Sequence, residues 1–595
     1  MKLRLIIFGI VLGGMSASCD DGFLDRPSED QVEAPYFFNT AKDLEVATND
    51  FYKAFSKDYE GDDWTSVYTE DAASDNLMPL NPAPRVRGSR VVPVGRRSGG
   101  WNWSGLRKIN YFLGNYHKVK DEAAKAKYGG IARFFRAYFY YDKVKTFGDV
   151  PWYSGVLDAK DPELYKARDS RALVMDSVMA DLDFAIANIP AEKQVNLITR
   201  YTAMLLKARV ALFEGTFRKY HGLEGADQYL ILAADAAQAL ITTNAYSLYT
   251  EGGAEGAYRN LFARNNQNNT ETLLAVDYEL GLKVHSLGNS FTSATQGSYG
   301  VPKDLINSYL MRDGSRFTDR PNYKTMGFFE EMQNRDPRLT QTTAGPEFRV
   351  NGETKNEPVN LSITTTGYRL IKALPDRAQW TTSGAYFDII LFRYAEALLV
   401  LAEAKAELGT LTQADLNISI NRLRARAGMP NLDMAQANAN PDPYLMAMYP
   451  NVKNDHGMQG VILEIRRERR AELFNEGFRW DDLMRWKEGQ KVMQPIVGVY
   501  FPGVGAYDFT GDGLADVFVH TGSTSGAPSS VTSMVNIRQR TLRDPLTGNR
   551  NSDFGNIDPF VDGGKFREDR DYLAPIPSEE LLLNENLRQN PKWDE

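Results

Sequence analysis

The chain has 595 residues, of which 43% are hydrophobic and 25% are charged, and it carries 69 Lys and Arg against 77 Asp and Glu. Such a chain can bury a sizeable core, so disorder is excluded for the bulk of it. The net charge of -8 excludes a general nucleic-acid binder, which needs a basic surface. The single cysteine, Cys19, excludes an internal disulfide and every metal site that needs several cysteines.

The N-terminus has the order of a secretory signal. Lys2 and Arg4 precede an apolar run that is too short to span a membrane, and small residues then lead to Cys19. Small residues directly before a cysteine resemble a bacterial lipobox, which implies that Cys19 is acylated and anchors the mature chain. The alternative is an incidental thiol just past the cleavage site.

These features predict a signal peptide over 1–18 and a lipidated tether over 19–35. Asp20 and Asp21 resemble the acidic export tag of surface lipoproteins in the Bacteroidetes group. We therefore expect the protein at the outer membrane, lipid-anchored and facing the extracellular side.

Helical patterns dominate the rest of the chain. Apolar residues at spacings of three and four predict helices over 41–57, 104–118, 130–145, 172–188, 200–217, 225–243, 388–408 and 412–427. Small residues such as Ala208, Ala211 and Gly215 predict closely packed helix faces, as in tetratricopeptide repeats. Because the repeat period is irregular, an ordinary helical bundle stays open as the alternative.

Long irregular stretches separate these helices, over 250–385, 428–455 and 490–570. Loops of this length are commonly functional, and the aromatic residues within them favour ordered, ligand-facing loops. We expect one domain over 36–595, made of a helical part (36–245), a loop-rich region (246–385) and a second helical part (386–595) with a loop insertion near 490–570.

A strongly charged segment follows, from Arg466 to Lys487. Its alternating Arg and Glu residues predict an i,i+4 lattice of ion pairs on a helix, and not a nucleic-acid patch. Trp480, Leu483 and Trp486 lie where such a helix would bury an apolar face.

Several segments, in this order along the chain, resemble the SusD/RagB family of outer-membrane nutrient-binding lipoproteins. They are Cys19 with Phe23-Leu24-Asp25 and Pro27, RAYFYYDKVKTFGDVPW (136–152), Asp336-Pro337-Arg338, FRYAEALLVLAEAKAELG (392–409), RRERRAELFNEGFRWDDLMRWK (466–487) and YLAPIPSEELLLNENLRQNPKW (572–593). The resemblance implies an all-α, tetratricopeptide-like scaffold with a loop-rich, ligand-facing region that contains small β elements. It also implies a protein that binds oligosaccharides or polysaccharide, or peptides in some branches, and caps a SusC-like TonB-dependent transporter.

Binding residues vary within that family, so ligand candidates come from chemistry. Sugar recognition needs flat aromatic faces together with amides, carboxylates or guanidinium groups for paired hydroxyls. Aromatic residues on irregular segments meet the first need and neighbouring acids and amides meet the second. The candidates, in order of preference, are Trp64, Trp380, Trp101, Tyr299 and Tyr278, with Asp75 and Asn76 as polar groups. Core packing is the alternative for each aromatic residue.

A short acidic loop offers a metal site. Asp508, Thr510, Asp512 and Asp516 place oxygen atoms around Gly513, a spacing that resembles the short calcium loops of integrin-type repeats. A structural Ca²⁺ ion would stiffen this loop, and no other cofactor is required. The alternative is a turn between two short strands.

Motifs of catalysis are missing from the sequence, which has no GxSxG elbow, P-loop or HExxH. We therefore expect a binding protein and not an enzyme. A secreted glycosidase is the remaining alternative, since the spacing of two catalytic carboxylates is invisible in sequence.

Overall fold

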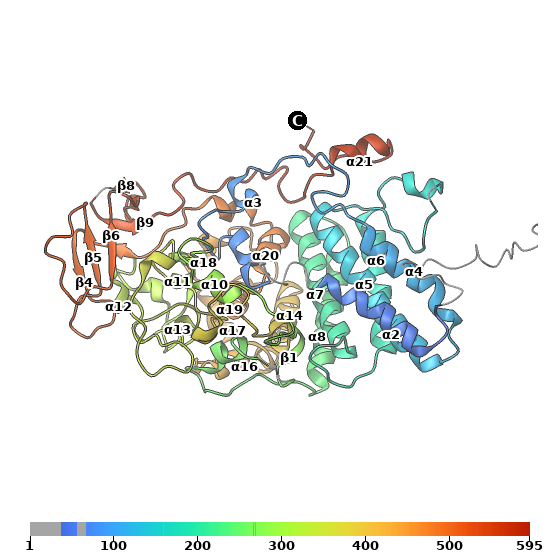
Figure 1. The fold of residues 1–595 in the computed structure, drawn as a ribbon, viewed down its shortest axis with the longest axis horizontal. Helices are drawn as coiled ribbons and strands as arrows, with labels where there is room; N and C mark the ends of the chain where they lie inside the picture. The colour runs from blue at the N-terminus through green and yellow to red at the C-terminus, as the bar shows by residue number, and fades with distance from the viewer. Residues whose placement is uncertain are drawn as a thin grey trace, which may run out of the picture.

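The computed structural model describes residues 37–55, 67–158, 160–265, 267, 269–551 and 553–594. The predicted signal peptide, the tether with Cys19, and Trp64 lie outside the described residues. The chain forms an elongated, mostly helical molecule with a bundle of long helices at one end and small sheets at the other (Figure 1). This confirms the prediction of a helical scaffold with small β elements.

The N-terminal end is a bundle of α-helices, of which α5–α6, α6–α7 and α7–α8 pack as successive neighbours. The elements from residue 37 to 245 are α2 (Ala41–Asn49), η2 (Asp50–Ala54), η3 (Val67–Ala73), α3 (Pro84–Arg87), α4 (Ser104–Asn115), η4 (Tyr116–Lys118), α5 (Glu122–Phe147), η5 (Pro162–Tyr165), α6 (Arg171–Asn188), α7 (Arg200–His221) and α8 (Ala226–Thr242). Of these, η3 and α3 lie outside the bundle and pack against the second helical part. Ser170 and Thr199 cap α6 and α7 through their hydroxyls, as helix starts require.

Close helix packing occurs where small residues were expected. Ala208, Ala211 and Gly215 of α7 are buried, and a Cβ atom at Gly215 would lie 2.8 Å from Cγ of Leu230 on α8. Only glycine allows the two helices to approach this closely. The short side chains therefore set the spacing of the bundle.

The second helical part begins with a strand that the sequence did not reveal. Residues 389–393 form β2 (Ile389–Arg393), which pairs antiparallel with β1 (Thr272–Val276), and α14 (Tyr394–Glu407) follows. The predicted helix over 412–427 is two helices that meet at Ser419. The elements after α14 are α15 (Gln413–Ile418), α16 (Ile420–Arg426), α17 (Met434–Ala439), α18 (Pro443–Met448), α19 (Gln459–Glu472), α20 (Arg479–Arg485) and η9 (Gly489–Met493).

The charged helix α19 is buried, and its ion pairs differ from the predicted i,i+4 pairs within one helix. Its residues from Gly460 to Glu472 are all buried, and most of their ionic partners lie on other elements. Glu472, for example, pairs with Arg338, Arg393 and Arg426. These ion pairs therefore lie in the core of the second helical part and connect its elements. Trp486 and Leu483 are buried as expected.

The loop-rich region contains short helices around an apolar cluster that includes Tyr258, Leu305 and Ile371 and extends to Tyr68 and Val517 outside this region. Its elements are α9 (Ala257–Phe262), β1, α10 (Leu287–Thr292), α11 (Lys303–Ser308), η6 (Phe317–Asp319), α12 (Phe328–Glu331), α13 (Leu339–Thr342), η7 (Leu361–Ile363) and η8 (Arg377–Gln379).

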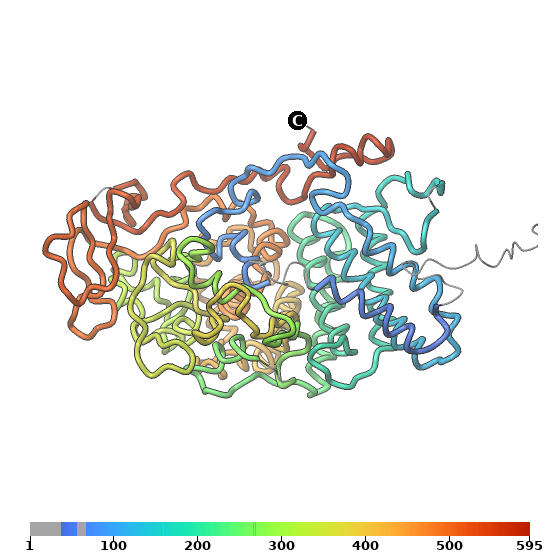
Figure 2. The backbone as a smooth tube through the Cα atoms, viewed as in Figure 1, coloured from blue at the N-terminus to red at the C-terminus, as the bar shows by residue number. Residues whose placement is uncertain are grey.

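The insertion near 490–570 forms two small sheets at the end of the molecule opposite the helical bundle (Figure 2). One sheet has the order β3-β9-β7-β8 and the other the order β4-β5-β6, with β5 and β6 parallel. The strands are β3 (Tyr500–Phe501), β4 (Gly505–Tyr507), β5 (Val517–His520), β6 (Ser533–Asn536), β7 (Leu542–Arg543), β8 (Arg550–Asn551) and β9 (Gly555–Ile557), and α21 (Ser578–Leu583) follows. No helix in the described part of the chain is long and apolar enough to cross a membrane.

Candidate functional site

Two of the predicted aromatic residues lie beside one short helix, α10. Trp380 and Tyr299 are both half-buried. Asn289 of α10 donates a hydrogen bond from Nδ2 to the main-chain oxygen of Trp380 (3.2 Å), and Phe291 of α10 packs edge-on against the ring of Tyr299 (6.1 Å). The helix thus holds an aromatic side chain on each of two neighbouring segments.

A glycine sets the position of Trp380. A Cβ atom at Gly288 would lie 2.0 Å from the main-chain oxygen of Gln379, so only glycine lets α10 approach η8. The indole Nε1 of Trp380 donates to the main-chain oxygen of Pro375 (3.1 Å). This bond fixes the plane of the ring before any ligand arrives.

Guanidinium groups lie close to the same indole. Arg377 and Arg369 lie 4.6 and 5.5 Å from the ring centroid of Trp380, within the range of cation–π attraction. Arg377 pairs with Glu353, Nε to Oε1 at 2.7 Å. Burial lowers the pKa of Arg369 to about 10. At neutral pH both side chains stay charged and could donate to hydroxyl or carboxylate groups of a ligand.

The main chain two residues before Tyr299 bonds an exposed leucine from the N-terminal part. The main-chain N–H of Leu80 donates to the oxygen of Gly297 (3.3 Å), and Leu80 is 44% exposed. Burial raises the pKa of the Tyr299 hydroxyl, so it stays a neutral donor and acceptor. We call the set Leu80, Asn289, Tyr299 and Trp380 the α10 surface. It combines apolar faces with amide and hydroxyl groups, as sugar binding requires.

Two predicted aromatic residues are core residues instead. Trp101 is 2% exposed, and its ring packs edge-on against Phe147 (4.9 Å). Tyr278 is 4% exposed, and its ring packs edge-on against His285 (4.5 Å). The prediction that these rings face a ligand is corrected, because neither presents a face to solvent. Gly100 and Asn102 around Trp101, and Asp277 and Glu279 around Tyr278, made both look like loop residues, and tertiary packing overrode that signal.

The predicted polar groups are structural as well. Asp75 is 3% exposed and bonds the guanidinium of Arg479, Oδ1 to Nε at 2.6 Å. Burial alone would raise the pKa of the Asp75 carboxyl, but Arg479 and Arg470 hold it well below its usual range. Asn76 accepts from Nε of Arg470 at 2.7 Å. Both side chains tie the segment before α3 to the buried charges of α19 and α20, so a ligand-facing role is corrected for both.

Leu80 and Asn289 were missed as members of the α10 surface, and Arg377 was missed as a neighbour of the Trp380 ring. Nothing in their local sequence marks them, since an exposed leucine and single polar residues are common in loops. The contact between α10 and η8 at Gly288 brings Asn289 to Trp380, and that contact is invisible in sequence, whereas Arg377 lies on the same segment as Trp380.

The acidic loop that was predicted to bind calcium is a hairpin turn. It joins β4 to β5, which pair antiparallel, as the alternative turn predicted. Asp508 accepts from the main-chain N–H of Gly513 (2.8 Å), and Asp516 accepts from those of Phe509 (2.9 Å) and Thr510 (3.0 Å). Asp512 accepts from the N–H of Leu514. The oxygen atoms are committed to the turn, and within the described ranges no three acidic, histidine or cysteine side chains gather as a metal site.

Comparison with known proteins places these observations in a family. Residues 240–593 match the model described as the SusD family, and residues 96–205 match the one described as "Starch-binding associating with outer membrane". Curated relatives include SusD-like protein P38 of Formosa agariphila, 24% identical over 63% of this chain and 69% of that protein. A SusD-like protein of Bacteroides ovatus is 24% identical over 82% of this chain and 83% of that protein.

Solved structures share the fold. A SusD-like protein from Bacteroides fragilis superposes with a TM-score of 0.67 at 19% identity, covering 95% of this chain and 99% of that one. A structure titled "Laminarin binding SusD-like protein" has a TM-score of 0.53 at 17% identity, covering 93% of this chain and all of that one. Because the SusD family model covers more than half of its residues, the chain belongs to the SusD family.

Proposed function

We propose that this protein captures oligosaccharides or polysaccharide at the outer membrane and delivers them to a SusC-like TonB-dependent transporter. One family model that matches the chain is described as starch-binding, and one structural relative is titled as laminarin-binding. The observation that carries the proposal is the pair of half-buried aromatic residues, Trp380 and Tyr299, held beside α10.

The α10 surface would bind sugars by stacking and hydrogen bonding. The apolar face of a sugar ring packs on an indole or phenol ring, while Asn289, Tyr299 and the neighbouring arginines offer groups for its hydroxyls. Because the indole of Trp380 is already fixed through Pro375, little rotamer entropy is lost on binding. Binding of this kind is reversible and permits release to a transporter.

The proposal also covers the cellular location of the protein and its lack of catalysis. Acylation of Cys19 would hold the chain at the outer membrane, facing outward. The protein would act on glycans by binding alone. Peptide capture and glycoside hydrolysis are the competing functions, and each has its own outcome in the experiment below.

Calorimetric titration with a panel of polysaccharides, beginning with laminarin and starch, tests the proposal. The wild type should bind at least one glycan, and Trp380→Ala should weaken that binding at least tenfold, since a central aromatic contact contributes about 2 kcal/mol. The matched control is Tyr165→Ala. Tyr165 is 50% exposed at the end of η5, away from α10, and its loss should leave the affinity unchanged.

Three outcomes contradict the proposal. A wild type that binds peptides and no polysaccharide supports peptide capture. Release of shorter sugars from a bound glycan supports a hydrolase. Equal affinity of Trp380→Ala and the wild type removes the α10 surface as the binding site.

A further inference from the structure

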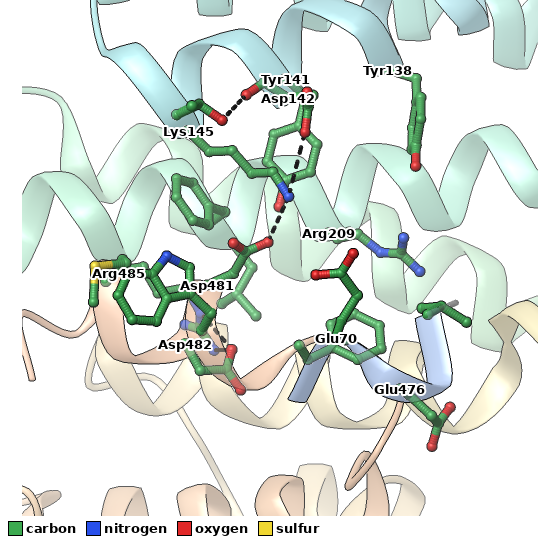
Figure 3. Close-up of a pocket in the computed structure, with 18 of the residues that line it drawn as sticks. Glu70, Tyr138, Tyr141, Asp142, Lys145, Arg209, Glu476, Asp481, Asp482 and Arg485 are labelled. Atoms are coloured by element: carbon green, nitrogen blue, oxygen red, sulfur yellow. Dashed lines mark hydrogen bonds and ion pairs between the residues drawn. The ribbon is translucent and has the colours of Figure 1, made fainter. Parts of the chain in front are cut away.

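A second concave site lies inside the molecule, where the N-terminal bundle meets the C-terminal helices (Figure 3). The cavity has a volume of about 520 Å³, which is within the range of small-molecule sites. Its walls come from α5 and α7 on one side and from η3, α3, α14 and α20 on the other. None of the four residues of the α10 surface is among its described lining residues.

One face of α5 forms the roof of this cavity. Tyr138, Tyr141, Asp142 and Lys145 follow one another at helical spacing, so all four side chains point to the same side. The ammonium group of Lys145 lies 2.9 Å from Oδ2 of Asp481 on α20. Burial would lower the pKa of Lys145, but the carboxylates of Asp481 and Asp142 raise it above its ordinary value. Lys145 is therefore a charged group whose charge is neutralised by its neighbours.

The other strong charges of the walls are also paired. Arg209 binds Glu396 through Nε (2.6 Å) and Nη2 (2.7 Å). Asp482 binds Arg469 and Arg485, with Nε distances of 2.8 and 3.0 Å. Most of the charge on the walls is thus balanced within the protein. A strongly charged ligand would have to break these pairs, whereas a neutral ligand would leave them intact.

A few polar groups are left with unused hydrogen-bonding capacity. Among the described residues, the hydroxyls of Tyr138 and Tyr141 make no hydrogen bond, and Nη1 of Arg209 makes none either. Within the same ranges, the carboxylate of Glu70 has Arg85 as its one ionic partner, at 3.8 Å. Figure 3 shows the side chains of Tyr138 and Glu70 extending toward the space beside Arg209. Polar atoms turned toward a common space without partners are what a binding site for a polar ligand presents.

We propose that this cavity binds a small neutral polyol of mono- or disaccharide size. Sugar hydroxyls both donate and accept, so they can use the carboxylate of Glu70, the guanidinium of Arg209 and the two phenol hydroxyls together. The rings of Tyr138 and Trp480 supply the apolar part of the wall. A bound sugar would contact the bundle and the C-terminal helices at once, so it would hold the two parts together.

This site is independent of the proposed capture of glycans at the α10 surface. A polymer binds on an exposed surface, whereas the cavity takes only a small molecule. The two proposals therefore fail separately, and each has its own variant.

Titration calorimetry of the full chain with D-glucose, D-galactose and D-xylose tests the cavity. At least one of the three should bind with a saturable heat. Tyr138→Phe and Tyr141→Phe should each weaken that binding about three- to tenfold, the effect of one lost hydrogen bond. Because neither hydroxyl is bonded in the free protein, both variants should keep the melting temperature of the wild type.

Tyr165→Ala, at an exposed residue outside both sites, is the matched control and should leave the affinity for the small sugar unchanged. The proposal is overturned if none of the three sugars gives a saturable heat, or if the dissociation constant is the same in the wild type and in both phenylalanine variants. It is also overturned if Trp380→Ala abolishes the binding, since the sugar would then occupy the α10 surface.

Discussion

The two helical parts of this protein bury their helices by opposite means. In α7, within the N-terminal bundle, the buried face is largely apolar and includes Leu205, Leu206 and Val210. In α19, every residue from Gly460 to Glu472 is buried and seven of them are charged. Helix α7 also buries Glu214, which pairs with Arg171 and Arg218, but most of its buried side chains are apolar, whereas α19 is held by a network of buried ion pairs. The two parts should therefore respond differently to a change in charge and to pH.

The largest effect is expected where the ionic network is broken. Glu472 is fully buried and contacts the guanidinium groups of Arg338, Arg393 and Arg426. Glu472→Gln keeps a side chain of the same size but removes the negative charge that the three guanidinium groups share. The free energy of unfolding should therefore fall by about 3–5 kcal/mol. Urea denaturation at neutral pH measures this loss. Glu122→Gln, whose side chain is 83% exposed, is the control and should cost less than about 0.5 kcal/mol.

The same substitution has a defined pH dependence. Burial would raise the pKa of Glu472, but the three arginines hold it well below the ordinary value of 4.5. A carboxylate with a depressed pKa stabilises the fold above pH 4.5, and this contribution is lost as the pH falls toward the folded-state pKa. The difference between Glu472→Gln and the wild type should therefore shrink in acid. A difference that stays constant between pH 7 and pH 3 would refute an electrostatic origin.

Substitution in the apolar bundle should behave differently. Leu206 of α7 is fully buried, so Leu206→Ala removes apolar contacts and leaves a cavity that costs about 3 kcal/mol. No charge changes, so the loss should be the same at pH 7 and pH 4. Urea denaturation at both values checks this. A loss that varies with pH would show that the bundle also depends on ionic contacts.

Helix positions in the bundle could be predicted because they depend on local patterns. The helix expected over 172–188 is α6 (Arg171–Asn188), and that expected over 225–243 is α8 (Ala226–Thr242). Apolar periodicity, hydroxyl caps and small residues all act within a few turns of chain. The strand β2 was missed because Ile389–Arg393 continues the apolar pattern of the helix after it, and its pairing with β1 joins residues more than a hundred positions apart.

Residues of the candidate site were harder to predict, for the same reason. In the sequence, Asp75 and Asn76 resemble exposed loop residues. Their partners Arg470 and Arg479 lie about 400 positions later in the chain, and these contacts place both side chains in the core. The charges of α19 look exposed because helical spacing alone accounts for them, yet their partners lie on other elements. Trp380 and Tyr299 stay candidates, chosen because aromatic residues in irregular segments are a chemical signal that a sequence shows. The helix that places them, α10, gives no such signal.

The smallest effect concerns a carboxyl of the ionic part that is not stabilised as an anion. Burial raises the pKa of Glu488 to about 7, even though Arg466 lies 3.6 Å away and Asn451 donates to Oε1 at 3.0 Å. A raised pKa means that the protonated form stabilises the fold. This contribution is complete below pH 4.5 and is lost as the pH rises through 7.

Glu488→Gln resembles the protonated carboxyl at every pH. The wild type should lose stability as the pH rises from 4.5 to 8, whereas the variant should not. The free energy of unfolding of the variant minus that of the wild type should therefore increase by about 2 kcal/mol over this range. For Glu472→Gln the same difference becomes more negative as the pH rises. Urea denaturation across this range, with Leu206→Ala as the variant that should show no trend, measures the change. If the variant instead loses stability as the pH rises, the Glu488 carboxylate is a supporting member of the ion-pair network, and the cost of its burial is smaller than its attraction to Arg466.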